Sequence, residues 1–143
     1  MVPGDLASHV TRTVLMALLG AHEAGASPEQ RQGMTLAALF HDLAVVPRPA
    51  DQWQDIGDEV GRLSSHFVHK IPDLPTPLVS LIESMLVGMD EFGMETWHNV
   101  PRDKGIESFA NLLRQIDRFD KVMQKQKTRL TRRLAFDQAK LSA

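Results

Sequence analysis

Residues 9–46 read HVTRTVLMALLGAHEAGASPEQRQGMTLAALFHDLAVV and contain two apolar segments separated by a short turn. Apolar residues recur at three- and four-residue steps across residues 5–24, which predicts an amphipathic helix. Gly25 is a typical helix end, and Ser27 to Gln30 form a typical helix start with a capping box and a proline at the first helical position. The second segment ends near His41-Asp42-Leu43 and is apolar on almost all sides. We therefore expect it to be the buried centre of a helical fold.

The rest of the chain has the same helical character. Apolar spacing predicts a short helix over 55–67, another over 77–88, and a long helix over 106–123 that continues to about residue 141. Prolines make 72–77 a rigid loop, and a second loop is marked by Gly88, Gly93, Trp97, His98 and Pro101. No segment has the pattern of a strand. We predict an all-α bundle of about five to seven helices. Residues 1–124 would form one helical domain, and residues 125–143 a basic helix packed on it or extending from it.

Composition narrows the function classes. The 143 residues include no cysteine, so neither a disulfide nor a thiolate metal site is available. No run of 18 apolar residues and no basic, apolar leader is visible, so we expect a cytoplasmic protein without a membrane partner. Charge is uneven, because residues 124–143 have six basic side chains against Asp137 alone. We interpret that segment as a solvated last helix and do not expect nucleic acid as a partner, since no recognisable reading motif accompanies it.

Histidines and aspartates recur at the ends and centres of the predicted helices. His9 lies on the polar edge of the first apolar stripe, His41 and Asp42 end the most buried helix, and Asp117 lies inside the long helix with Asp120 one turn later. Taken singly, a helical histidine is far more often structural than a ligand. Together, imidazole and carboxylate groups suit a divalent metal. A buried helix end with two such groups is also costly unless they are paired or coordinated.

The spacing of these residues resembles the HD superfamily of metal-dependent phosphohydrolases, and its HD-GYP branch most closely. Residues 9–46 look like the opening pair of helices of that branch, with its first His and its His-Asp pair. The segment IPDLPTPLVSLI, residues 71–82, looks like the one before its later histidines. The segment FANLLRQIDRFDKVM, residues 109–123, looks like its closing helix, in which two aspartates three residues apart are usual.

The resemblance implies a metal site and a reaction. The metal ligands would be His9, His41, Asp42 and Asp117, and Asp5 would be an additional ligand one turn before His9. The metal would be one divalent ion of Mn, Fe, Ni, Zn or Mg. Asp42 would be the catalytic residue that orients the attacking water, and the substrate would be a nucleotide or another phosphate ester. Lys125 and Arg129 are the residues we expect to contact its phosphate.

The sequence also departs from the HD-GYP pattern. Leu43-Ala44-Val45 follows the His-Asp pair where that branch usually has Ile-Gly-Lys, and Met85-Leu86-Val87 replaces its later His-His-Glu. Phe92-Gly93-Met94 stands where its Gly-Tyr-Pro signature would fall. Because apolar side chains cannot coordinate a metal, we expect a mononuclear site. Two hypotheses follow: a single-metal phosphohydrolase, or an inactive signalling module that binds a ligand, a partner protein or a second copy of itself.

Overall fold

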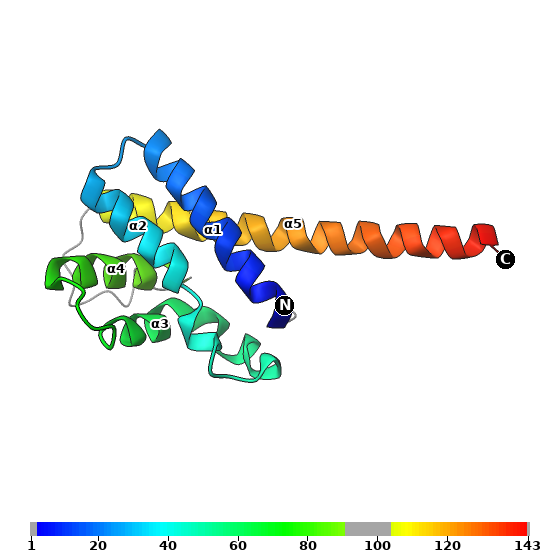
Figure 1. Ribbon diagram of the computed structural model, residues 1–143, viewed down its shortest axis with the longest axis horizontal. Helices are drawn as coiled ribbons and strands as arrows, with labels where there is room; N and C mark the ends of the chain where they lie inside the picture. Colours follow the sequence, from blue (N-terminus) through cyan, green and yellow to red (C-terminus); the bar gives the residue numbers. More distant parts are fainter. Residues whose placement is uncertain (1–2, 91–103, 143) are drawn as a thin grey trace.

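The computed structural model describes residues 3–90 and 104–142, and every regular element in them is helical (Figure 1). The α-helices are α1 (Pro3–Glu23), α2 (Pro28–Phe40), α3 (Val60–Val68), α4 (Thr76–Met89) and α5 (Lys104–Ser142). Three 3-10 segments join α2 to α3: η1 (Leu43–Val45), η2 (Ala50–Gln52) and η3 (Gln54–Glu59). The predicted all-α class is confirmed.

The helices α1 and α2 form a hairpin whose turn follows the sequence signals. Gly25 has a φ of 68°, the left-handed conformation that glycine adopts without a steric penalty. Ser27 caps α2, and its side chain accepts from the backbone N–H of Gln30 while the Gln30 side chain accepts from the backbone N–H of Ser27. The hairpin places the C-terminal end of α2 beside the N-terminal half of α1.

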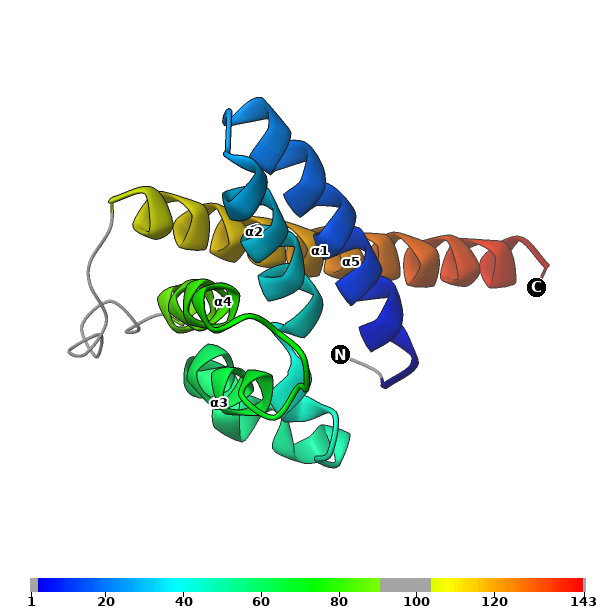
Figure 2. The same cartoon turned by 60° about the vertical axis from the view of Figure 1, so that its left-hand side comes forward.

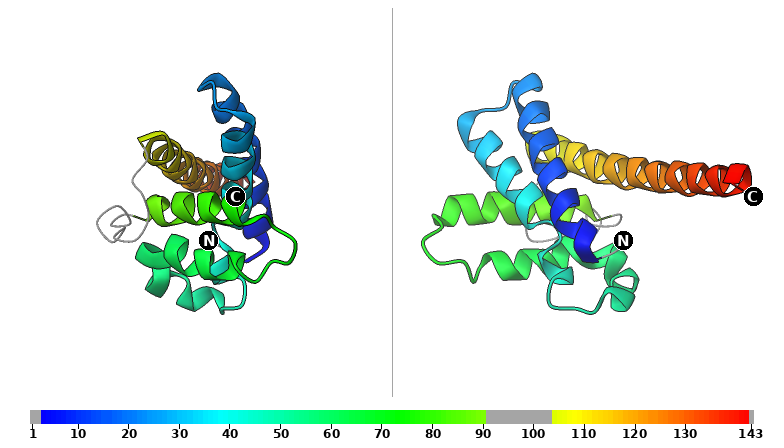
Figure 3. Two further views of the ribbon diagram at one scale, coloured as in Figure 1. Left: turned by 90° about the vertical axis from the view of Figure 1, so that its left-hand side faces the viewer. Right: turned by 45° about the vertical axis from the view of Figure 1, so that its right-hand side comes forward.

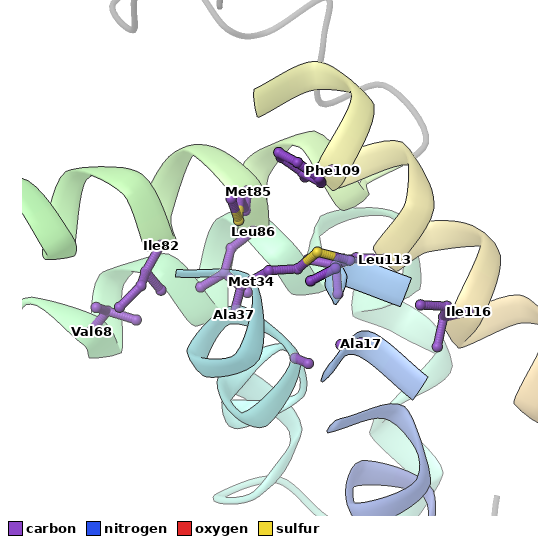
Figure 4. Close-up of a cluster of buried hydrophobic side chains, with 12 residues drawn as sticks. Ala17, Met34, Ala37, Val68, Ile82, Met85, Leu86, Phe109, Leu113 and Ile116 are labelled. Carbon is purple, nitrogen blue, oxygen red and sulfur yellow. The ribbon is translucent and has the colours of Figure 1, made fainter. Parts of the chain in front are cut away.

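The core lies where α2, α4 and α5 meet (Figure 4). Its largest fully buried side chains come from these three helices (Met34, Ile82, Met85, Leu86 and Leu113), and Val68 of α3 joins them. The helices α3 and α4 form a second hairpin. In Figure 2, α5 passes behind α1 and α2, and α4 also packs against it. The predicted second helix has one buried face, on which Met34, Ala37 and Ala38 have no exposed surface, whereas Leu39 is 46% exposed, so the helix is not buried on all sides.

Two details differ from the prediction. The expected helix over 55–67 is divided, because η3 ends at Glu59 and α3 begins at Val60. Glu59, with φ −123° and ψ 6°, interrupts the helical backbone there. Gly88 lies buried inside α4 rather than in a loop. The remaining markers of that predicted loop, Gly93, Trp97, His98 and Pro101, lie outside the described residues, as does the Phe92–Met94 segment.

The helix α5 is much longer than the bundle is wide. Its second half projects away from the other helices, as the right-hand view of Figure 3 shows. Every side chain from Lys125 to Leu141 is exposed. The helix is continuous through residue 124, so the basic segment extends from the bundle as part of α5. No helix in the described part of the chain is long and apolar enough to cross a membrane.

Candidate metal centre

Four predicted ligands come together from three helical segments. His9 belongs to α1, His41 is the C-cap of α2 with Asp42 directly after it, and Asp117 lies in the middle of α5. One ligand atom from each lies within 4.8 Å of all the others. His9 and His41 are only 1% and 3% exposed. The sequence placed His9 at the polar edge of the first helix, but α5 crosses α1 there and covers it. The fifth predicted ligand, Asp5, is exposed and does not join this group.

The imidazole Nε2 atoms face each other and the two carboxylates. The two Nε2 atoms are 3.2 Å apart. Asp117 Oδ1 lies 2.8 Å from His9 Nε2 and 3.2 Å from His41 Nε2. Asp42 Oδ2 lies 3.0 Å from His41 Nε2 and 3.5 Å from His9 Nε2. Two nitrogens and two oxygens therefore surround one small buried volume.

The Nδ1 atoms of both imidazoles form hydrogen bonds outside the cluster. His41 Nδ1 donates to the backbone carbonyl of Ala38 at 2.6 Å, and a carbonyl can only accept, so this nitrogen carries a proton. His9 Nδ1 donates to Asp120 Oδ2 at 2.7 Å. In the neutral tautomers these bonds leave both Nε2 lone pairs directed at the cluster. Such outer hydrogen bonds are typical of histidines that ligate metals.

Asp120 and Arg12 form an outer layer that sequence reasoning did not assign. Asp120 is 3% exposed and receives two bonds from Arg12, from Nε at 2.6 Å and from Nη2 at 3.0 Å. Burial alone would raise the pKa of Asp120, but the bonds from Arg12 and His9 outweigh it and the pKa is lowered. The available signal was spacing, because Arg12 follows His9 by three residues and Asp120 follows Asp117 by three.

Burial and neighbouring charges shift the pKa values of the cluster residues in opposite directions. Burial lowers the pKa of His41, but the carboxylates of Asp42 and Asp117 more than compensate and raise it to about 10. The pKa values of Asp42 and Asp117 are lowered despite burial, in both cases because of the neighbouring imidazoles. The cluster thus attracts positive charge, and a proton on His41 supplies it when no metal ion is bound.

An open pocket of about 910 Å³ extends from the cluster to the surface. Its walls come from the start of α1, the η2–η3 region, and the face of α5 beyond Asp117. Asp5, Lys125 and Arg129 all line it, so both predicted phosphate contacts share the pocket with the cluster. Lys121, which sequence reasoning missed, donates to Asp117 Oδ2 at 3.1 Å and lines the same wall.

The positions that depart from the HD-GYP pattern have packing roles. Met85 and Leu86 have no exposed surface and belong to the core formed with α2 and α5. Ala44 and Val45 are buried in a smaller cluster with Ile56. Side chains packed in this way leave no second group of ligands beside the first among the described residues.

In comparisons with protein-family models, with curated proteins and with solved structures, nothing matches this chain. The resemblance to the HD superfamily therefore stays a prediction.

Proposed function

We propose that this protein is a metal-dependent phosphohydrolase with a mononuclear site formed by His9, His41, Asp42 and Asp117. One observation carries the proposal. Two buried imidazoles whose Nδ1 atoms are engaged elsewhere direct their Nε2 atoms at two carboxylates, at the base of an open pocket. A histidine that only stabilises the fold does not require a second imidazole nitrogen 3.2 Å from its own Nε2, as His9 and His41 have here.

The donor set fits a divalent transition metal. Imidazole nitrogen and carboxylate oxygen together suit Mn, Fe, Ni or Zn, whereas Mg prefers a shell of oxygen atoms. These four groups would hold the ion, and the pocket that opens from them has room for a water molecule and a substrate oxygen. When bound, such an ion lowers the pKa of water and stabilises charge that develops on phosphoryl oxygens.

The residues of the chain supply the rest of the chemistry. Asp42 orients the attacking water and accepts its hydrogen bond. The water oxygen forms a bond to phosphorus, the phosphoester P–O bond breaks, and the leaving oxygen takes the proton that the water releases. Lys121 and Lys125, on the α5 wall, balance the negative charge of the phosphate. They stand in place of the lysine that the sequence lacks after Asp42.

Hydrolysis of a generic phosphodiester such as bis(p-nitrophenyl) phosphate tests the proposal. The protein is stripped of metal, reloaded with Mn, Fe, Ni or Zn, and assayed beside His41→Ala and the matched control His22→Ala, whose histidine is exposed on α1. We expect turnover only with metal, its loss in His41→Ala, and its retention in His22→Ala. Undiminished turnover in the stripped protein would contradict the proposal. Inactivity with every metal and ester would favour the non-catalytic module.

A further inference from the structure

The basic residues of α5 are sorted between two faces of the helix. Lys121, Lys125, Arg129 and Arg132 follow one another at steps of four, four and three residues and line the pocket. Lys127, Arg133 and Lys140 belong to the same exposed half of α5 but do not line it. With a rise of 1.5 Å per residue, the four pocket-lining cations extend over about 16 Å from the cluster outward.

Three of these four cations have no acidic partner among the described residues. Lys121 pairs with Asp117, but Lys125, Arg129 and Arg132 make no ion pair with any acidic group in the described part of the chain. Three unpaired cations on successive turns repel one another and add nothing to the core. They suit a ligand that presents several negative charges in a row.

The opposite wall has a different chemistry. Asp5 of α1 and Asp51 of η2 also line the pocket and are exposed, and their charge repels a chain of anions toward the cations of α5. Trp53 also lines the pocket, and its indole N–H donates to the Arg48 carbonyl at 3.0 Å. That bond helps to fix an aromatic ring in the lining of the pocket that the cations share. A nucleobase is the group that stacks on such a ring.

We propose that the ligand is a single-stranded oligonucleotide whose phosphates follow Lys121, Lys125, Arg129 and Arg132 while a base stacks on Trp53. At 3.4 Å per phosphate of a stacked strand, 16 Å corresponds to about five phosphates, and to fewer in an extended strand. A mononucleotide reaches only part of this length. This inference rests on the proposed function for the phosphate that reacts, but the binding itself needs no metal. It revises the expectation that nucleic acid is not a partner, because that expectation treated the basic segment as uniformly solvated.

The test measures binding of fluorescein-labelled oligothymidylates of one to eight nucleotides by anisotropy, in EDTA so that nothing is cleaved. Lys125→Gln/Arg129→Gln removes two pocket cations, and the matched control Lys127→Gln/Arg133→Gln removes one lysine and one arginine outside the pocket. We expect affinity to rise with length up to about five nucleotides. The pocket variant should bind the oligonucleotide at least about tenfold more weakly. Its slope of log K against log salt should be shallower by about 1.4, because each contact with a single strand contributes about 0.7 to that slope. The affinity of the control variant should change less than threefold.

A Trp53→Leu variant and inorganic polyphosphate separate the ligand classes. We expect Trp53→Leu to weaken oligonucleotide binding and to leave polyphosphate binding unchanged. Equal losses in the two charge variants would overturn the inference in favour of non-specific attraction. Equal affinity for one and for eight nucleotides would overturn it in favour of a single phosphate, and preference for polyphosphate would overturn it in favour of a chain without bases.

Metal-dependent ester hydrolysis without oligonucleotide binding would refute this inference alone. Length-dependent binding without hydrolysis would refute only the proposed function.

Discussion

Asp120 determines how His9 is presented to the cluster. Its carboxylate lies between His9 Nδ1 and the Arg12 guanidinium, so it fixes both the tautomer and the orientation of the imidazole. His41 has a simpler arrangement, because the carbonyl of Ala38, three residues earlier in the same helix, is its partner. One ligand thus depends on a contact between distant helices and the other on local helix geometry.

We predict that Asp120→Asn lowers metal affinity by about 10- to 100-fold, since loss of an outer partner of a ligating histidine has that effect. The matched control is Asp137→Asn, which removes an exposed carboxylate from the same helix. Isothermal titration with Mn or Zn measures both. An unchanged dissociation constant in Asp120→Asn would show that Asp120 does not support the site.

The start of α3 packs closely against the end of α4. Asp90, the C-cap of α4, accepts from the backbone N–H groups of Gly61 and Arg62 at 2.6 and 2.8 Å and so caps the start of α3. The backbone of Gly61 approaches α4 so closely that an added Cβ would lie 2.0 Å from the Leu86 carbonyl oxygen. Only glycine allows this approach.

We predict that Gly61→Ala lowers the free energy of unfolding by about 3 kcal/mol, at the upper end of overpacking costs, because the obstructing atom belongs to the backbone. Gly57→Ala is the control, since a Cβ there meets nothing within 4 Å. Urea denaturation compares the two. Equal stability of both variants would contradict the described packing of α3 on α4.

We predict a pH dependence from Asp90. Burial raises its pKa to about 6, although the N–H groups of Arg62 and Gly61 act in the opposite direction. The folded state then binds the proton more tightly than the unfolded state, so stability due to this group falls as pH rises from about 4 to about 6. The unfolding free energy of the native protein should fall relative to Asp90→Asn by at most roughly 3 kcal/mol over that window. Parallel pH curves would contradict the raised pKa.

The molecule combines a compact bundle with a projecting helix, and the two parts differ in how far the sequence predicts them. Gly25 and the Ser27 capping box predict the α1–α2 hairpin because their signals are local. The grouping of His9, His41, Asp42 and Asp117 followed from spacing and resemblance together. Spacing also indicates Asp120, one turn after Asp117, but its contacts with His9 and Arg12 arise only where α5 crosses α1. The contact of Lys121 with Asp117 has no such signal in the sequence.

We predict that a chain ending at Thr128 keeps the stability of the full chain within about 1 kcal/mol, because every described side chain removed is exposed. It should also keep its metal, while losing the pocket residues Arg129 and Arg132. Urea denaturation and elemental analysis check both points. A large loss of stability would show that the projecting half of α5 packs on something outside the bundle, such as a second copy.

Metal stoichiometry decides whether His9, His41, Asp42 and Asp117 hold an ion. The protein is purified without chelator, and elemental analysis counts Mn, Fe, Ni and Zn per chain beside His41→Ala, Asp117→Asn and the exposed control His22→Ala. We expect one ion per chain in the native protein and the control, and none in the two site variants. A native protein that holds no ion, even after incubation with each metal, would contradict this expectation.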